Sequence, residues 1–277
     1  MLSRLYSRLR NSSSKFIESD LDYNRFRNGK HIFIFGVLGR CSTTALQRIL
    51  NSSEEITVSG ESKGIVAQLL YTLKSLSLFH DQFRDNYERF EKCFAKKKHT
   101  RIYPMALNTE ECSDSVKHSI VALLKPLHGG LRFGFKDIEV GSEDTLESLL
   151  QLFPKSKFVF LFREPGSQFQ SVQAQAYWDY SKSIVSFIEK YVSLSDLYIQ
   201  FHKKNRTGIF LENTSLHDPK KVDLLLRKLS ISSYDKTLIG DNLFSTKNKI
   251  VDVRRDSEIG NSEAFKAYLR LRELSSC

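Results

Sequence analysis

Short runs of apolar residues along the chain alternate with longer segments in which apolar positions recur every three or four residues. The short runs are rich in Phe, Ile, Val and Leu, which predicts strands of a parallel sheet that is buried on both faces. We expect such strands at residues 31–37, 56–58, 131–135, 157–162 and 207–211.

The longer segments have the spacing of amphipathic helices. Because they alternate with the strands, the pattern predicts an α/β fold, a three-layer sandwich in which helices flank a central parallel sheet. Residues 79–108 are rich in Lys and Arg with interleaved Phe and Tyr, and we interpret them as a helical insertion within a single domain of residues 31–277. The helices are expected at residues 43–50, 62–79, 113–124, 143–152, 168–178, 184–203 and 220–229.

The chain carries an excess of positive charge, with 42 Lys and Arg against 32 Asp and Glu and a formal net charge of +10. Such an excess serves solubility, or it attracts an anionic partner such as a nucleotide, an acidic glycan, nucleic acid or a membrane surface. Charge alone does not choose among these. The cysteines at positions 41, 93, 112 and 277 are far apart, which disfavours a zinc site and a disulfide framework and suits a reducing, cytoplasmic location.

The N-terminal residues form a basic extension, residues 1–30, which we expect to be helical. Residues 1–15 are rich in Arg and Ser and lack acidic residues, which is also typical of a mitochondrial transit peptide and makes an organellar location the alternative. Leucines at helical spacing within residues 1–12 suit peripheral contact with a membrane. No apolar run approaches the roughly 20 residues that span a bilayer, so we expect a soluble protein without a transmembrane segment.

The segment HIFIFGVLGRCSTTALQRIL, residues 31–50, has the form of a phosphate-binding loop between a strand and a helix. In parallel sheets, ligands bind at the carboxyl ends of strands, where N–H groups of the next helix donate to phosphate or sulfate oxygens. Arg40 adds a guanidinium, and Ser42, Thr43 and Thr44 add hydroxyl groups. The same hydroxyl groups suit a plain helix cap, so this stretch alone leaves cap and anion site open.

This loop departs from the Walker pattern G-x-x-x-x-G-K-[ST] of nucleotide hydrolases. Counted from Gly36, Cys41 occupies the position of the second glycine and Ser42 that of the lysine. The departure disfavours a metal-dependent kinase or NTPase. It also raises the question of which phosphate the loop binds and which cation replaces the lysine.

A second candidate site lies in FREPGSQFQS, where the buried run KFVFLF ends at Arg163 and Ser171 follows eight residues later. Together with GRCSTT of the first loop, this segment resembles the sulfotransferases that use 3′-phosphoadenosine-5′-phosphosulfate (PAPS). In that family a loop of the type R-S-G-T-T binds the 5′-phosphosulfate, and an R-[DE]-P strand end with a later serine binds the 3′-phosphate. The resemblance covers roughly residues 31–62 and 131–230 and implies a P-loop-like fold.

Within that family the chain is most similar to the tyrosylprotein and glycan-type group, whose loop is followed by a G-E pair, here Gly60 and Glu61. Further similar segments are FKDIEV, QLFPKSKFVFLF and GIFLENTSLHDPKK. The chain departs from the pattern because its loop has one residue more before Arg40 and because Cys41 and Ser42 replace the usual S-G. A glycine that lets the backbone approach a phosphate is therefore absent.

The resemblance implies a role for each site residue. Arg40 and Lys136 are the expected cationic donors to the leaving phosphate oxygen, and Glu61 is the expected general base for the acceptor hydroxyl. Cofactor binding is expected from Arg40, Cys41, Ser42, Thr43, Thr44, Arg163 and Ser171.

Other polar residues have lesser expected roles. A histidine is the base in another branch of the family, so His99, His118 and His128 are alternatives to Glu61. Asp137 and Glu212 are expected to orient neighbours or cap helices. The basic and aromatic residues 86–104 suit the lining of an acceptor cleft, and residues 240–277, with the basic cluster 246–256, are expected to cover the cofactor.

The sequence thus predicts a sulfotransferase that moves a sulfuryl group from PAPS to an acceptor hydroxyl without a metal. The acceptor is a glycan by preference, with a protein tyrosine or a lipid-linked sugar as alternatives, and a basic cleft suits an acidic glycan or peptide. No nucleic-acid partner is expected. The rival interpretation is a non-catalytic nucleotide- or nucleic-acid-binding protein with a vestigial loop, which would have no need for both Glu61 and Lys136.

Overall fold

A computed structural model describes residues 24–62, 64–95, 109–124, 132–138, 142–175, 178–239 and 259–275, and for residues 82–95 the backbone alone. Its contacts divide the chain into two compact units. The first, which we call the helical unit, comprises Met1–Arg27 and Lys63–Leu123, and the second, the sheet unit, comprises Asn28–Ser62 and Leu124–Cys277. The interpretation of residues 31–277 as a single domain stays a prediction.

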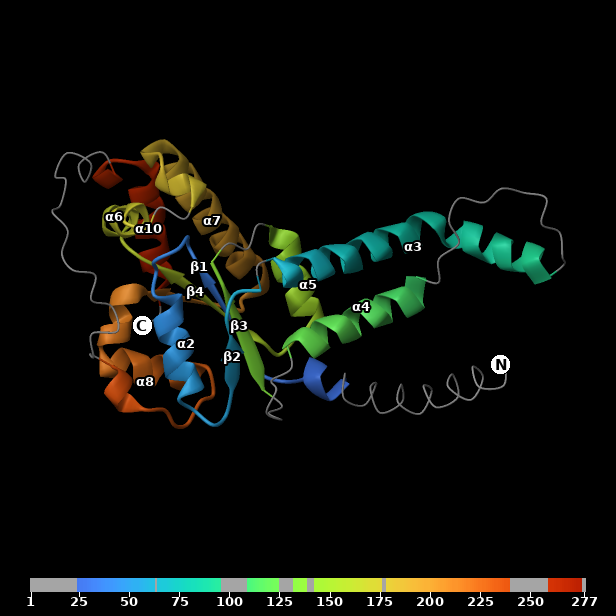
Figure 1. Cartoon of the computed structure of the whole chain (residues 1–277), viewed down its shortest axis with the longest axis horizontal. Coiled ribbons are helices and arrows are strands. Elements are labelled where there is room, and N and C mark those ends of the chain that lie inside the picture. Colours follow the sequence, from blue (N-terminus) through green and yellow to red (C-terminus); the bar gives the residue numbers. More distant parts are fainter. Residues whose placement is uncertain are drawn as a thin grey trace. The chain divides into compact units, whose positions relative to one another are not determined.

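The sheet unit is built on five parallel strands (Figure 1). They are β1 (Ile32–Gly36), β2 (Thr57–Ser59), β3 (Phe133–Asp137), β4 (Lys157–Phe162) and β5 (Gly208–Glu212), in the spatial order β2-β3-β1-β4-β5. This arrangement confirms the predicted central parallel sheet. It also places the loop after β1 beside the ends of β3 and β4, because β1 pairs with both.

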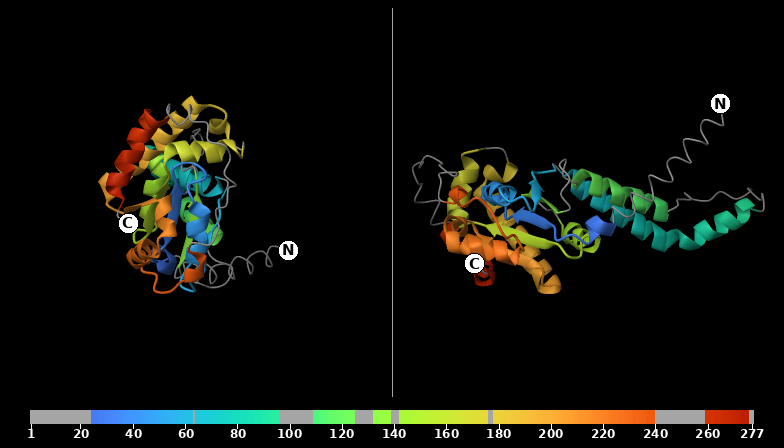
Figure 2. Two further views of the ribbon diagram at one scale, coloured as in Figure 1. Left: turned by 90° about the vertical axis from the view of Figure 1, so that its left-hand side faces the viewer. Right: turned by 90° about the horizontal axis from the view of Figure 1, so that it is seen from below.

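Helices cover both faces of the sheet, as expected for a three-layer α/β fold (Figure 2). The α-helices of this unit are α2 (Thr43–Asn51), α5 (Glu143–Leu152), α6 (Pro165–Gln173), α7 (Ile184–Asn205), α8 (Pro219–Lys228) and α10 (Glu263–Leu274). Short 3-10 helices are η1 (Asp179–Ser181), η2 (Asn213–His217) and η3 (Lys236–Leu238).

The alternation of side chains along the strands gives the sheet one aromatic and one aliphatic face. On the aromatic face, rings from β1 and β4 pack against α7 and rings from β3 pack against those of β1. Phe160 stacks on Tyr198 with ring centroids 4.4 Å apart. On the aliphatic face, Ile34 and Val159 belong to a buried cluster that includes residues of α2 and α8. The aromatic set comprises Phe33, Phe35, Phe133, Phe135, Phe158 and Phe160.

The helical unit contains α3 (Ile65–Ala95) and α4 (Thr109–Leu124). The sequence predicted a helix over 62–79 followed by an insertion from residue 79, whereas α3 continues through this boundary to Ala95. Residues 1–23, 96–108 and 240–258 lie outside the described residues, and so do most of the predicted N-terminal extension and the basic cluster 246–256. Within the described part of the chain, none of the helices combines the length and hydropathy of a membrane span.

Candidate active site

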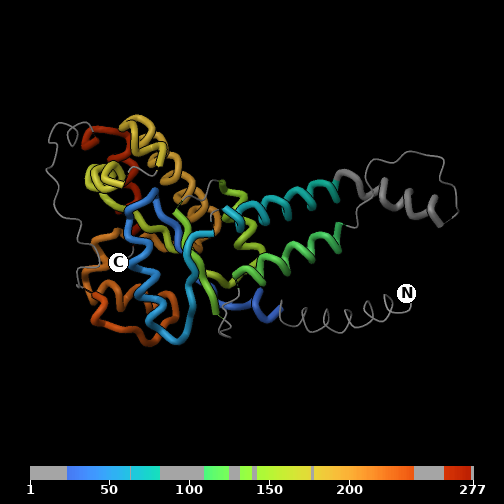
Figure 3. The backbone as a smooth tube through the Cα atoms, in the orientation of Figure 1, coloured from blue at the N-terminus to red at the C-terminus, as the bar shows by residue number. Residues whose placement is uncertain are grey.

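The chain passes from β1 to α2 through a tight loop (Figure 3). Every second residue from Leu38 to Ser42 in this loop is left-handed. The φ angles of Leu38, Arg40 and Ser42 are 65°, 67° and 74°. Such angles cost a non-glycine residue about 1–3 kcal/mol and are concentrated at functional sites. Left-handed residues in a turn direct successive N–H groups into an anion-binding concavity. Ser42, which stands where the family has glycine, has therefore adopted the conformation that glycine favours.

The N-cap side chain of α2 forms no hydrogen bond to the helix, a feature that α2 shares with α10 among the α-helices described in the sheet unit. By contrast, Ser142 caps α5, Glu164 caps α6 and Asp218 caps α8, each through a side-chain oxygen that accepts from a backbone N–H. The first turn of α2 also lacks an acidic residue. The hydroxyl of Ser42 is thus not a helix cap, and the geometry favours the anion-site interpretation that the sequence had left open.

Cys41 turns its side chain away from the loop surface and into the core. Its thiol is fully buried, and Sγ donates to the carbonyl oxygen of Leu38 at 3.2 Å. Burial raises the pKa of this thiol to about 12. A Cβ atom on Gly36 would lie 2.5 Å from Sγ, so this glycine makes room for the thiol. The expected contact of Cys41 with the nucleotide stays a prediction, and it would have to come from the backbone.

Two arginines and a serine that are far apart in sequence meet beside this loop. Arg40 Nε donates to Ser171 Oγ at 3.0 Å, and Arg163 Nη1 donates to the carbonyl oxygen of Arg40 at 3.4 Å. Burial, and next the positive charge of Arg40, lower the pKa of Arg163. Within the described residues, neither guanidinium forms an ion pair with a carboxylate. The nearby carboxylate of Glu164 offsets the charge on Arg163 only in part, so the two adjacent cations are suited to binding an anion.

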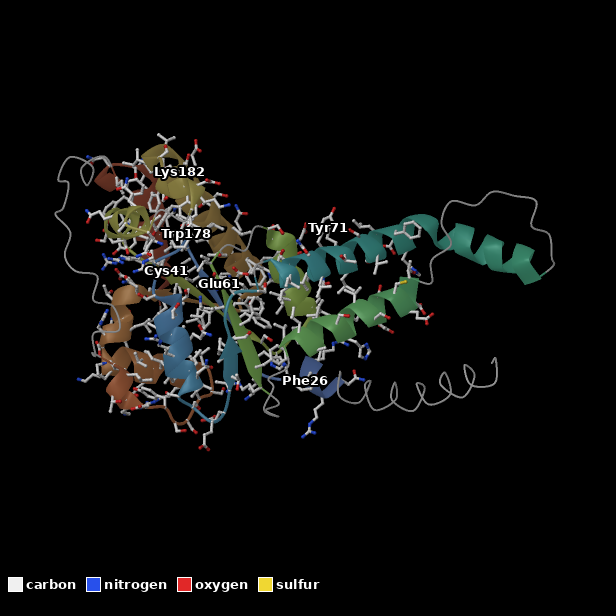
Figure 4. The ribbon with its side chains drawn as sticks, viewed as in Figure 1. Phe26, Cys41, Glu61, Tyr71, Trp178 and Lys182 are labelled. Carbon is white, nitrogen blue, oxygen red and sulfur yellow. The ribbon has the colours of Figure 1, made fainter. Side chains whose placement is uncertain are left out.

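Lys136 and Glu61 form an ion pair at the same end of the sheet, with Lys136 Nζ 2.6 Å from Glu61 Oε1. The side chain of Lys136 is 9% exposed and that of Glu61 is 39% exposed. Lys136 pairs in register with Ile34, and the two share the sheet face that packs on α2. The positive charges of both Lys136 and Arg163 act on the thiol of Cys41, so Cys41 lies near the lysine and near Arg163. Figure 4 labels Cys41 and Glu61 in this region.

The predicted threonines occupy the first turn of α2. Thr43 is buried, and its Cγ2 atom lies near Gly36, whereas Thr44 is exposed. The loop therefore presents the hydroxyl of Thr44 more openly than that of Thr43. Their contacts with a nucleotide stay predictions.

Side chains that sequence reasoning missed hold the loop and the strand end in place. Gln168 Nε2 donates to the carbonyl oxygens of Val37 and Gly39, at 2.6 Å each. The Tyr180 hydroxyl accepts from the N–H of Gly39 at 3.2 Å. The hydroxyls of Tyr198 and Tyr191 donate to the carbonyl oxygens of Gly36 and Arg163, at 3.2 and 2.8 Å. No sequence signal singled out these residues, because each lies among ordinary helix-core positions.

Trp178, which Figure 4 labels, lies against the loop at Gly39. A Cβ atom on Gly39 would lie 2.7 Å from the indole, so glycine is required there for this approach. The indole stacks on Tyr180 with ring centroids 5.7 Å apart. Gly39 is therefore constrained by the aromatic pair rather than by its own φ angle.

Other polar candidates have structural partners or lie elsewhere. Asp137 Oδ1 accepts from the N–H of Ile138 at 2.8 Å. Glu212 accepts from the Tyr268 hydroxyl at 2.6 Å and pairs with Arg272 at 3.5 Å. His118 lies on α4 in the helical unit, while His99 and His128 fall outside the described residues. Among the residues that the structure describes, no group of three or more His, Cys, Asp or Glu is arranged to hold a metal ion.

Comparison with solved structures finds the same fold in sulfotransferases of low sequence identity. The sulfotransferase domain of the Synechococcus PCC 7002 olefin synthase aligns over 89% of this chain and 94% of its own, with 13% identity and a TM-score of 0.52. A sulfotransferase from Alicyclobacillus acidocaldarius aligns over 88% of this chain and 95% of its own, with 13% identity and a TM-score of 0.51. No curated protein matches the sequence.

A family model described as "Sulfotransferase family" matches residues 31–213, which is about two thirds of the 277 residues. The match begins at β1 and ends just after β5, so it includes the loop, the arginine pair and the Lys136–Glu61 pair. Members of this family transfer sulfuryl groups. The chain therefore belongs to the sulfotransferase family.

Proposed function

We propose that the sulfuryl donor of this transferase is PAPS. The observation that carries the proposal is the arginine pair, Arg40 and Arg163, which lies beside an uncapped helix start without a carboxylate partner in the described residues. PAPS supplies two separate anionic groups, a 5′-phosphosulfate and a 3′-phosphate. The residues fit such a ligand, because cationic and N–H donors gather around one loop from three elements of the sheet unit.

Each end of the donor has its own set of residues. The loop after β1 and the start of α2 bind the 5′-phosphosulfate through Arg40, the backbone from Cys41, and the hydroxyls of Ser42, Thr43 and Thr44. Arg163 and Ser171 bind the 3′-phosphate. The Arg40–Ser171 hydrogen bond joins the two sets directly, so the halves of the site form one connected network.

Transfer then needs a base and a cation at the reacting sulfur. An acceptor oxygen forms a bond to sulfur while the bond between sulfur and the bridging phosphate oxygen breaks, which releases 3′,5′-adenosine bisphosphate. Glu61 accepts the proton of the acceptor hydroxyl, and Lys136 and Arg40 stabilise the negative charge on the leaving oxygen. The carboxylate of Glu61 supplies the oxygen that accepts this proton, and Lys136 Nζ lies 2.6 Å from its Oε1 atom.

The acceptor and the subgroup belong to the same proposal. The G-E position of Glu61 and the segment FKDIEV support the tyrosylprotein and glycan-type group, with a glycan hydroxyl as the acceptor ahead of a protein tyrosine or a lipid-linked sugar. We place the enzyme in the cytoplasm, without a nucleic-acid partner. The rival interpretation as a non-catalytic binding protein loses support because the Lys136–Glu61 pair suits catalysis and adds nothing to a vestigial loop.

A transfer assay with ³⁵S-labelled PAPS tests this proposal. The acceptors offered are a neutral glycan, an acidic glycan, a lipid-linked sugar and a tyrosine peptide, and formation of 3′,5′-adenosine bisphosphate is followed in parallel. We expect label in a glycan, with one bisphosphate formed for each sulfuryl group transferred. A folded protein that neither consumes PAPS nor binds 3′,5′-adenosine bisphosphate would contradict the proposal, and label in the tyrosine peptide alone would correct the acceptor.

A further inference from the structure

One buried amide side chain holds two carbonyl oxygens of the phosphate-binding loop. Gln168 lies on α6, one turn before Ser171, and is 0% exposed. Both of its N–H donors are used, one by Val37 and one by Gly39. Its Oε1 atom is buried and, within the described residues, has no hydrogen-bond partner. The unsatisfied oxygen is unfavourable for folding, and the two hydrogen bonds to buried carbonyl oxygens offset this cost.

The hydrogen bonds of the Gln168 amide also set the directions of backbone N–H groups in the loop, because each peptide group is planar. In a trans peptide, the C=O of one residue and the N–H of the next point in opposite directions. When Gln168 holds the carbonyl oxygens of Val37 and Gly39 on its own side, the N–H groups of Leu38 and Arg40 must point away from it. Leu38 and Arg40 are two of the left-handed residues of the loop.

The intervening peptide is fixed in the same way by other partners. The carbonyl oxygen of Leu38 accepts from Cys41 Sγ, and the N–H of Gly39 donates to the Tyr180 hydroxyl. Three successive peptide groups therefore have set directions. Within the described residues, the N–H of Arg40 has no hydrogen-bond acceptor, so it is available to a ligand.

We propose that Gln168 is a positioning residue of the nucleotide site, which keeps the N–H of Arg40 directed toward the 5′-phosphosulfate by holding the carbonyl oxygens of Val37 and Gly39. This inference rests on the proposed use of PAPS. It assigns to α6 two different tasks, since Ser171 belongs to the 3′-phosphate end while Gln168 serves the 5′ end. The two ends can therefore be separated with nucleotides that carry one phosphate or both.

The test compares Gln168→Met, which keeps the side-chain size and removes both donors, with wild type and with Ser167→Ala, an exposed position on the same helix. Each protein is titrated calorimetrically with 3′,5′-adenosine bisphosphate and with adenosine 3′-monophosphate. We expect Gln168→Met to weaken bisphosphate binding about tenfold and to leave the 3′-monophosphate unchanged, because only the 5′ group uses the loop. Ser167→Ala is expected to bind both nucleotides as wild type does.

Other results would overturn the inference. Equal weakening of both nucleotides would mean that Gln168 merely supports α6, and unchanged binding of both would mean that it does not position the loop. A folded wild type that binds neither nucleotide would overturn the proposed function, and this inference with it. Tyr180→Phe provides a second variant that leaves α6 intact, with a smaller loss expected for the bisphosphate alone.

Amide hydrogen exchange gives a readout that needs no nucleotide. The N–H groups of Val37 and Gly39 donate to Leu161 O and to the Tyr180 hydroxyl, so both are expected to exchange slowly in wild type. In Gln168→Met, we expect faster exchange at these two amides. Exchange at the α5 amides, which do not depend on the loop, is expected to stay the same. Unchanged exchange at Val37 and Gly39 would show that Gln168 does not hold the loop.

Discussion

The two cationic regions of the site differ in what neutralises them. Among the described residues, Arg40 and Arg163 form no ion pair with a carboxylate. Burial and the charge of Arg40 lower the pKa of Arg163, and the nearby carboxylate of Glu164 opposes this shift only in part. Lys136, which is more buried, is already paired with Glu61 at 2.6 Å. The arginine pair can therefore form ion pairs with a bound anion, whereas Lys136 already forms an ion pair within the protein.

This difference predicts separate roles for the two regions, nucleotide binding for the arginines and catalysis of sulfuryl transfer for the lysine. An uncompensated pair of guanidiniums gains most from an incoming phosphate, so the arginines are expected to supply affinity. A lysine that gives up or shares its carboxylate gains less on binding. Its contribution is expected in the transition state, where charge develops on the leaving oxygen.

The largest effect is expected from Glu61→Gln, which removes the base and keeps the side-chain size. Loss of a general base lowers turnover by about 10²–10⁴-fold. Binding of 3′,5′-adenosine bisphosphate should be nearly unchanged, because Glu61 contributes no donor to it. The measurement is steady-state transfer from labelled PAPS, together with calorimetric titration. Activity within a few fold of wild type would contradict the role of Glu61 as the base and would favour a histidine instead.

Lys136→Met comes next and tests the other half of the ion pair. We expect turnover to fall by about 10²–10³-fold, as for loss of one donor to a developing oxyanion. Because Glu61 is partly exposed, the carboxylate left behind can be hydrated, and the variant should fold. A loss confined to PAPS affinity, with turnover unchanged, would place Lys136 with the arginines and remove the distinction between the regions.

The buried thiol of Cys41, which lies near both regions, gives a pH-dependent prediction. The pKa of Cys41 is raised from 9.0 to about 12 in the folded protein, so its stabilisation is complete below pH 9 and is lost as the pH rises toward 12. Relative to Cys41→Ala, wild type should lose up to about 4 kcal/mol of unfolding free energy over this interval. Urea unfolding of both proteins between pH 8 and about pH 11 measures the early part of the difference. Parallel pH profiles would show that the thiol is not protected by burial.

The smallest effect is expected from Ser42→Gly. Ser42 holds a φ angle of 74° without capping α2, so glycine should relieve strain and stabilise the protein by about 0.5–1 kcal/mol. Thermal unfolding measures this change, and Ser142→Gly is the matched control, since Ser142 is extended and does cap its helix. The control should lose stability. If Ser42→Gly also loses stability, the serine hydroxyl holds the loop after all.

Most strands and helices of the sheet unit could be predicted from the sequence, because short apolar runs are typical of buried strands. The bounds of β4 and α5 agree with the predicted ones, and residues 38–42 were expected as a turn between a strand end and the start of a helix. The start of α6 was placed at Gln168 instead of Pro165, because the prediction ignored Glu164 as a cap and Pro165 as a first helical residue.

What the sequence did not predict depends on contacts between distant residues. The left-handed angle of Ser42 and the burial of Cys41 depend on Gly36 and on the carbonyl oxygen of Leu38. In the sequence, Gln168 looks like an ordinary polar residue of a short helix, and only the structure reveals its contacts with the loop. Pairing of Lys136 with Glu61 likewise requires the register between β2 and β3, which no local pattern reveals.

Calorimetric titration of Arg163→Ala with 3′,5′-adenosine bisphosphate tests the account most directly. Arg48→Ala is the matched control, since Arg48 is an exposed arginine in the last turn of α2. We predict tight binding by wild type and by Arg48→Ala, and a loss of about 10–100-fold for Arg163→Ala, the worth of hydrogen bonds to a charged group. Equal affinities for the two variants, or no binding by a folded wild type, would contradict the claim that the arginine pair is the nucleotide site.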